Sequence, residues 1–284
     1  MAPHRAGLRA GRPLGAPTRG KTAAGRLRHL DAFCALYAGP LLARRCGPWR
    51  DAAFVDLGFG ASPDTTLESA RCFRRLAPEL PVIGVEIDAS RVAGASAQAD
   101  RLTQFRLGGF NLPLADDRDP PERARLIRAF NVLRQYEPEA VQPAWTAMAE
   151  ALLPGGLLVE GSSDPIGKRW VANLLRRVTP DAGQVAPGLR LEAIVFGCRP
   201  PTFAEPGDFP GLLPKQLIHR MRPGEPIHAF FDAWQRAFAQ RAPDRVWGPG
   251  RRFAASARQM AESGWSIDPR DRWLGRGFLI WSAP

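Results

Sequence analysis

A glycine-rich stretch near the N-terminus has the letters of a phosphate-binding loop. Residues 15–22, "GAPTRGKT", fit the pattern G-x-x-x-x-G-K-[ST], in which backbone N–H groups and the lysine cradle nucleotide phosphates. Such a loop needs a buried strand directly before its first glycine. The preceding "MAPHRAGLRAGRPL" contains prolines, arginines and no apolar run of strand length, and Pro17 removes one N–H donor from the loop. We therefore expect no triphosphatase role for Lys21, and an extended arm in place of a nucleotide loop.

A second glycine turn has the context that the first one lacks. In "AAFVDLGFGASPDTTLESARCFRRL", an apolar run over residues 52–57 is followed by Gly58 and Gly60, and then by Ser-Pro-Asp, which is typical of a helix start. A second apolar run, "PVIGVEID", places Glu86 at its end. The pattern predicts a strand–turn–helix–strand unit with an acid at the tip of the second strand.

Two classes of cofactor use such a unit. A dinucleotide site wants a third small residue that lets helix and strand pack closely, and here Pro63 stands near that place. S-adenosylmethionine has no pyrophosphate, so only the first turn must let the backbone approach closely, which glycine permits. An ionised Glu86 would accept hydrogen bonds from both ribose hydroxyls. The residues favour S-adenosylmethionine, and a nicotinamide-dependent enzyme is the alternative.

Three further strands and a helix follow in the order that an α/β sheet requires. "FRLGGFNLPL" predicts a third strand and a tight loop, and residues 126–130 predict a fourth strand. Residues 138–152 predict a helix, which a Pro-Gly-Gly turn separates from a fifth strand over residues 157–160.

The ordered set "FVDLGFG", "GVEID", "FNVL" and "LLPGGLLVEG" covers roughly residues 50–165. In this set the chain resembles the class I S-adenosylmethionine-dependent methyltransferases, and among them actinobacterial-type members. The resemblance implies an α/β, Rossmann-like sheet of seven strands, mostly parallel with the last strand antiparallel, and helices on both faces. "LEAIVFGC" and "GFLIWSAP" would be the sixth and seventh strands.

The resemblance also implies which residues hold S-adenosyl-L-methionine. Asp56, Gly58 and Gly60 would line its methionine and ribose side. Glu86 would bind the ribose. Ile87 would lie against the adenine, with Phe110 and Asn111 near the adenine edge. The chain departs from the family pattern at Ser62, which replaces the third glycine, and after the third strand, where no aspartate stands.

The acceptor side is predicted from topology. Substrates of open α/β sheets bind beyond the carboxyl ends of the strands, where Asn131 and Asp164 follow the fourth and fifth strands. Asn131 does not begin the N-P-P-[FYW] motif of adenine or glutamine methylation. We expect the long segment 199–272 to be a helical insertion that covers the substrate, and His219 within it to be a candidate base, because histidine titrates near neutral pH.

Charge is distributed unevenly along the chain of 284 residues, whose net charge is +11. Residues 1–50 hold ten Lys/Arg and one acid, whereas the rest hold 29 bases and 27 acids. We therefore divide the chain into a basic arm (1–28), flexible or acting as a lid, and a methyltransferase domain (29–284). The four cysteines and four histidines are dispersed, so we expect reduced thiols and no metal site.

No apolar run reaches the roughly 18 residues of a membrane span, and no signal peptide is recognisable, so we expect a cytoplasmic protein without a membrane partner. The leading hypothesis is a methyltransferase acting on a small or medium-sized metabolite. The alternatives are an RNA methyltransferase that grips nucleic acid through residues 1–28, and a non-catalytic cofactor-binding protein. The sequence does not identify the methyl acceptor or the oligomeric state.

Overall fold

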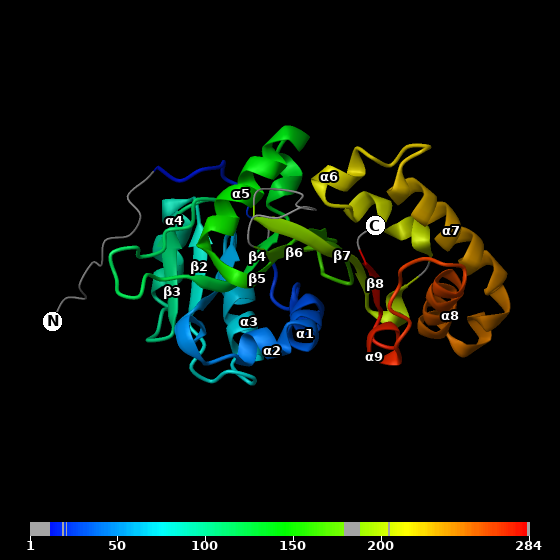
Figure 1. Cartoon of the computed structure of the whole chain (residues 1–284), viewed down its shortest axis with the longest axis horizontal. Helices are drawn as coiled ribbons and strands as arrows, with labels where there is room; N and C mark the ends of the chain where they lie inside the picture. Colours follow the sequence, from blue (N-terminus) through cyan, green and yellow to red (C-terminus); the bar gives the residue numbers. More distant parts are fainter. Residues whose placement is uncertain (1–11, 19, 21, 179–187, 204, 283–284) are drawn as a thin grey trace.

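The computed structural model describes residues 12–18, 20, 22–178, 188–203 and 205–282. One eight-stranded sheet runs through the molecule in the order β3-β2-β1-β4-β5-β6-β7-β8 (Figure 1). Its strands are β1 (Ala53–Leu57), β2 (Val82–Glu86), β3 (Thr103–Leu107), β4 (Ala124–Phe130), β5 (Leu152–Ser163), β6 (Arg169–Arg177), β7 (Leu189–Cys198) and β8 (Phe278–Ser282).

The first five strands in this order are parallel to their neighbours. From β1 the chain moves first to one side, to β2 and β3, and then crosses to the other side, to β4 and β5. Leu57 at the end of β1 lies level with Val85 of β2 and Ala129 of β4, so the carboxyl ends of all three strands meet at one edge. This is the switch point at which doubly wound sheets bind their ligands.

The last three strands form an antiparallel meander. The Rossmann-like, mostly parallel fold class is confirmed, but the expected number of seven strands is wrong. The sheet has eight, because β6, "RWVANLLRR", pairs with β5 and β7 where no strand was expected. As a result both β6 and β8 run against the parallel strands, rather than the last strand alone.

Helices cover both faces of the sheet, as expected. Phe54 and Leu126 pack on one face with Phe33 of α1 and Phe73 of α3, whereas Val55 and its neighbours pack on the other face with α5. The helices are α1 (Arg28–Tyr37), α2 (Gly39–Ala43), α3 (Asp64–Phe73), α4 (Ala89–Ser96), α5 (Val141–Ala151), α6 (Lys215–Ile218), α7 (Pro226–Gln240), α8 (Pro249–Glu262) and α9 (Asp271–Leu274). Seven 3₁₀ turns also lie in the described residues: Gly47–Trp49, Leu133–Gln135, Pro138–Ala140, Pro200–Thr202, Pro206–Asp208, Pro210–Leu212 and Ala242–Trp247.

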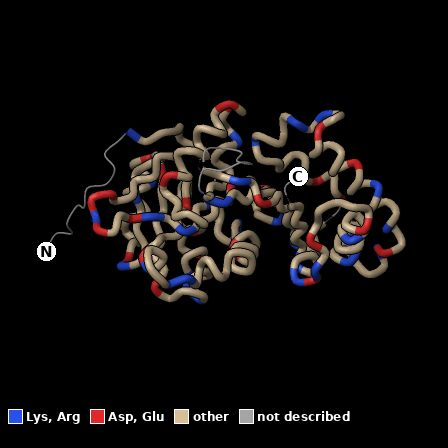
Figure 2. Tube along the Cα trace, viewed as in Figure 1, with Lys and Arg blue, Asp and Glu red and all other residues tan. Residues whose placement is uncertain are grey.

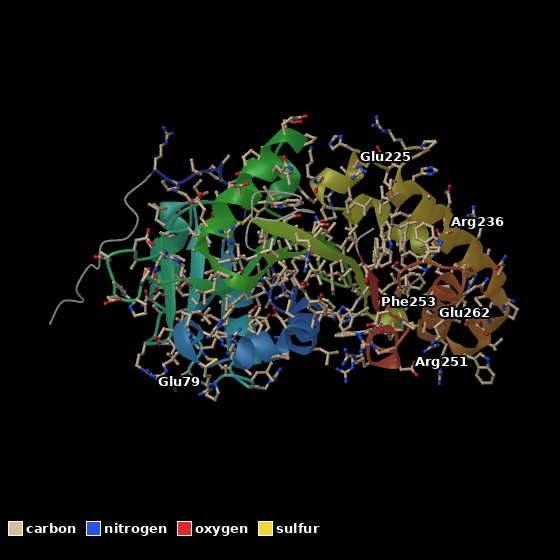
Figure 3. All side chains as sticks on the ribbon, viewed as in Figure 1. Glu79, Glu225, Arg236, Arg251, Phe253 and Glu262 are labelled. Carbon is tan, nitrogen blue, oxygen red and sulfur yellow. The ribbon has the colours of Figure 1, made fainter. Side chains whose placement is uncertain are left out.

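The segment between β7 and β8 builds a core of its own. Aromatic side chains of α7 pack on Phe196 of β7, and Phe253 of α8 packs on Trp234 of α7. Trp234 donates its indole N–H to Ser256 Oγ at 3.1 Å. Phe253 of α8 lies inside this core, whereas Arg251 and Glu262 of the same helix lie on the outside (Figure 3). The aromatic residues spaced along α7 therefore serve packing.

Acidic and basic residues are interspersed along the described trace, and blue and red segments mix over the sheet and the helices (Figure 2). None of the helices in the described ranges is both long and apolar enough to span a bilayer.

Candidate functional site

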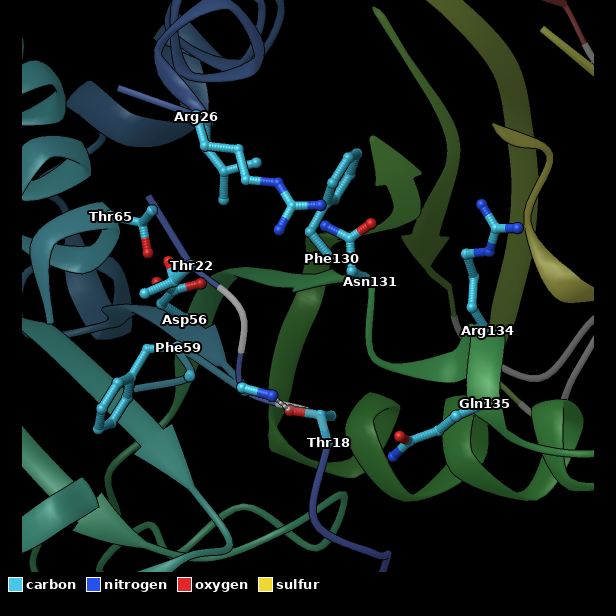
Figure 4. A pocket seen from close by; sticks show the side chains of 14 residues that line it. Thr18, Thr22, Arg26, Asp56, Phe59, Thr65, Phe130, Asn131, Arg134 and Gln135 are labelled. Atoms are coloured by element: carbon cyan, nitrogen blue, oxygen red, sulfur yellow. Dashed lines mark hydrogen bonds between the residues drawn. The ribbon is translucent and has the colours of Figure 1, made fainter. Parts of the chain in front are cut away.

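A cleft of about 380 Å³ opens at the switch point, between the ends of β1 and β4 (Figure 4). Its walls come from the turn after β1, the end of β4 with the turn that follows, and the described part of the arm. The residues that line it are Thr18, Gly20, Thr22, Arg26, Leu27, Asp56, Gly58, Phe59, Gly60, Thr65, Phe130, Asn131, Arg134 and Gln135.

The glycine turn forms the floor of the cleft. Gly58 and Gly60 have φ values of 75° and 86°, a region that residues with a Cβ rarely adopt. A Cβ on Gly58 would lie 2.6 Å from Val132 Cγ2, so the close approach of the two strand ends also requires glycine there. Both predicted glycines thus lie at the cleft, with a physical reason for their identity.

Glu86 closes the same turn from the end of β2. Its buried carboxylate accepts hydrogen bonds from the N–H groups of Gly60 and Ile87, each at 2.9 Å. Arg91 Nη1 lies 3.6 Å from Glu86 Oε1 and is a buried donor without a hydrogen-bond partner among the described residues. The Asp88 N–H also donates to Glu86 Oε1, at 3.4 Å. A carboxylate can accept about four hydrogen bonds, so Glu86 retains capacity for a hydroxyl ligand.

The glycine turn and the carboxylate fit a ribose-bearing cofactor. The turn lines the cleft, and Glu86 lies at the neighbouring strand end. The two predicted groups therefore meet in space although 26 residues separate Gly60 from Glu86.

Asp56 lines the cleft, but its carboxylate is already engaged. It receives two hydrogen bonds from the buried guanidinium of Arg128, at 3.0 and 2.8 Å, and a third from Thr66 Oγ1 at 2.6 Å. Arg128 also binds Asp31 and Ser69, at 2.5 and 2.7 Å. Asp56 thus anchors the end of β1 to β4, and its charge is balanced within the protein.

Asn131 lies at the cleft, directly after β4. Among the described residues, it is the one non-glycine residue with a positive φ, which is 60°. Its Oδ1 accepts the Ser163 N–H at 3.0 Å, and its Nδ2 donates to Ser163 Oγ at 3.3 Å. Arg26 Nε donates to the same hydroxyl at 3.1 Å, so the arm, β4 and β5 meet at Ser163.

Two candidates for the acceptor site lie outside the lining. The Asp164 carboxylate accepts the N–H groups of Ile166, Lys168 and Arg169, at 3.0–3.1 Å, and so holds the turn between β5 and β6. His219 is exposed at the end of α6 and is not among the residues that line the cleft. The structure therefore does not bring these two side chains together with Asn131.

The adenine-side candidates line a second and much smaller cavity, which we call the nucleoside pocket. Glu86, Ile87 and Phe110 lie in its wall beside Tyr136, and about 20 Å³ remains open. Asn111 lies next to Phe110 and is hydrogen-bonded to the arm. Arm residues 14–16 and Thr18 form one side of the wall, and the strand ends and the loop after β3 complete it with Leu57, Gly58, Gly108, Gly109 and Val132.

The sequence interpretation missed several residues of the cleft. Arg134 and Gln135 come three and four residues after Asn131, so the rule that placed Asn131 beyond β4 could have placed them too. Thr65 in the first turn of α3 could have been found likewise.

Burial lowers the pKa of Arg26, and Asp164 offsets part of this effect. Lys21 lies outside the described residues.

Comparison with known proteins finds similarity to solved structures only. No protein-family model and no curated protein sequence matches the chain. Similar solved structures include magnesium protoporphyrin IX methyltransferase from Synechocystis PCC 6803 with bound SAH, at 14% identity over 48% of this chain and 54% of that chain, with a TM-score of 0.35.

Two others were solved with SAM. Human N-acetylserotonin methyltransferase is 19% identical over 48% of this chain and 36% of that chain, with a TM-score of 0.30. The amino pentose methyltransferase CalS10 from Micromonospora echinaspora is 19% identical over 63% of this chain and 73% of that chain, with a TM-score of 0.34. The matches span about half or less of the first two chains, and at these TM-scores they carry no argument about the reaction of this one.

Proposed function

We propose that this protein is an S-adenosylmethionine-dependent methyltransferase whose acceptor is a small or medium-sized metabolite. The observation that carries the proposal is the contact between the glycine turn and Glu86 at the switch point, beside a cleft of about 380 Å³. Gly58 and Gly60 would let the cofactor approach the backbone, and Glu86 would hold its ribose hydroxyls.

When bound, the cofactor would supply an electrophilic methyl group on its sulfonium. The protein's part is then mainly to hold the acceptor atom in line with that group, which can account for a large share of a rate enhancement. Asn131 is suited to this task, because two hydrogen bonds to Ser163 fix its side chain at the end of β4. We propose Asn131 as a residue that positions the acceptor.

We assign no protein base to the reaction. The one carboxylate in the lining of the cleft, Asp56, is engaged by Arg128 and Thr66. His219 and Asp164 lie outside that lining. An acceptor that needs no assisted deprotonation, or one that loses its proton to water, fits this arrangement best.

The cations Arg26 and Arg134 at opposite sides of the cleft favour ligands that carry negative charge (Figure 4). Arg26 is suited to the cofactor's carboxylate or the acceptor, because the arm holds it beside Phe130 and Asn131. Arg134 lies at the rim and donates to Gly211 O at 2.8 Å.

We propose that the segment 199–272 covers the acceptor side. Two contacts support this role: Arg134 binds the carbonyl of Gly211, and Ser162 of β5 donates to the carbonyl of Leu212. Both carbonyls belong to this segment, so its start borders the cleft while its helices pack on β7 and β8.

The test is incubation of the protein with methyl-labelled S-adenosylmethionine and a fractionated metabolite extract. We expect label to appear in a small-molecule fraction with the wild-type chain and not with Glu86→Ala. Label in an RNA fraction, with binding that weakens steeply with salt and depends on residues 1–28, would favour the nucleic-acid alternative. Cofactor binding without label in any fraction would favour a non-catalytic role.

A further inference from the structure

The described part of the arm lies across the nucleoside pocket and bonds with its backbone to the groups there. Leu14 donates its N–H to Asn111 Oδ1 at 2.9 Å, and its carbonyl accepts the Phe110 N–H at 2.9 Å. Asn111 Nδ2 donates to the Arg12 carbonyl at 3.2 Å. Three hydrogen bonds thus tie residues 12–14 to the loop after β3.

A second set of bonds holds the next residues of the arm. The Ala16 N–H donates to the Tyr136 hydroxyl at 2.5 Å, and the Ala16 carbonyl accepts from Gln135 Nε2 at 3.1 Å. Further along, the Thr18 carbonyl accepts from Arg91 Nη2 at 3.0 Å. The segment 12–18 is therefore anchored by residues that follow β3, by residues that follow β4 and by Arg91 of α4.

The arm leaves no room there for a nucleobase. The open space of about 20 Å³ corresponds to one or two water molecules, whereas adenine is a ring system of ten heavy atoms. The backbone packs directly on the pocket wall: a Cβ placed on Gly109 would lie 2.0 Å from the Leu14 carbonyl oxygen.

The groups that hold Leu14 have the right chemistry for adenine. Asn111 Oδ1 and the Phe110 N–H present an acceptor and a donor, and the backbone N–H and C=O of Leu14 satisfy them. Adenine carries an amino donor next to ring-nitrogen acceptors, so it offers the same complementary pair. One set of groups cannot serve both partners at once.

We propose that the segment 12–18 occupies the nucleoside pocket as an internal competitor, which must withdraw before the adenosine part of a cofactor can enter. The inference rests on the proposed function, because it takes the bound nucleoside to be that of S-adenosylmethionine. A competing arm lowers the apparent affinity for the cofactor by the fraction of molecules in which the pocket is open. The arm thereby controls loading of the cofactor.

The first test compares the full chain with a chain that lacks residues 2–16, using calorimetry with S-adenosylhomocysteine. We expect the shortened chain to bind at least about five-fold more tightly, the factor that the loss of one ordinary hydrogen bond from the competitor would produce. A point variant refines the test. Leu14→Pro removes the N–H that binds Asn111, whereas the matched control Leu14→Ala keeps it and changes only a half-exposed side chain. We expect Leu14→Pro to tighten binding and Leu14→Ala to leave it within about two-fold.

The second test follows the amides of Leu14 and Ala16 by hydrogen exchange in the full chain. We expect both to be protected without ligand and to lose protection when S-adenosylhomocysteine is added. Weaker or unchanged binding by the shortened chain, or protection that persists with ligand, would overturn the inference and leave the proposed function standing. If neither chain binds S-adenosylhomocysteine, the proposed function itself fails.

Discussion

The Gly60 N–H donates a hydrogen bond to Glu86 Oε2 at 2.9 Å, and this contact joins the turn after β1 to the end of β2. The carboxylate is 1% exposed and also accepts the Ile87 N–H. It therefore sets the shape of the turn as well as supplying acceptors for a ribose.

We predict that Glu86→Gln weakens binding of S-adenosylhomocysteine by about ten-fold or more, because an amide loses the charge assistance and one acceptor oxygen. Calorimetry measures the change, with Glu79→Gln as the control. Glu79 is exposed, pairs with Arg101 and lies beside the opposite, amino-terminal ends of the strands (Figure 3). Equal affinity in the two variants would remove Glu86 from the cofactor site.

Arg128 links the cleft to the core through two carboxylates. We predict that Arg128→Met lowers the free energy of unfolding by about 3–5 kcal/mol, because Asp31 and Asp56 would be left buried without their cation. The control is Arg101→Met, which breaks an exposed, solvent-screened pair with Glu79 and should leave the free energy of unfolding nearly unchanged. Urea denaturation measures both, and similar losses would contradict a supporting role for the buried pair.

The backbone conformation of Asn131 leads to a separate prediction about stability. Asn131→Gly loses the side-chain bonds to Ser163 but tolerates a φ of 60°, whereas Asn131→Ala loses the same bonds and must also adopt that conformation. We expect the alanine variant to be less stable than the glycine variant by about 1 kcal/mol. The difference in thermal stability between the alanine and glycine variants measures the cost of the positive φ. A more stable alanine variant would disprove that cost.

Glu160 predicts a pH dependence of stability. Burial raises the pKa of this carboxyl on β5 to about 7, and the hydrogen bond from Asn173 lowers it only in part. Between the unfolded value near 4.5 and about 7 the folded state binds more protons, so stability falls as pH rises through this window. Glu160→Gln should therefore raise the melting temperature at pH 8 and have little effect at pH 5.

The matched control for Glu160 is Glu262→Gln, because Glu262 is exposed on α8. Differential scanning calorimetry at the two pH values measures both variants. A Glu160→Gln variant that melts at the wild-type temperature at pH 8 would show that the buried carboxyl carries no such cost.

Local patterns predicted the parallel half of the sheet, because its strands are short apolar runs that end in recognisable turns. They missed β6 for a physical reason. Residues 170–175, "WVANLL", are buried on both faces of the strand, and periodicity alone cannot tell such a short run from a segment of buried helix. The number of strands could not follow from periodicity there.

At the site, too, some contacts could be predicted from the sequence and others could not. The turn "DPIGKR" after β5 has the Asp-Pro-x-Gly letters of an Asx turn, a signal that could have assigned the Asp164 carboxylate to backbone N–H groups. The bonds of Leu14 to Asn111 and Phe110 are different. They join backbone to residues almost one hundred positions away, and no side-chain pattern in the arm encodes them.

The central claim is that the cleft at the switch point binds S-adenosylmethionine. The most direct measurement is calorimetric titration of the chain lacking residues 2–16 with S-adenosylhomocysteine and, separately, with NAD. We predict one binding site for S-adenosylhomocysteine with a dissociation constant in the low micromolar range or tighter, about −8 kcal/mol or better, and no heat of binding with NAD. Binding of NAD, or the absence of any binding of S-adenosylhomocysteine by this folded chain, would contradict the account.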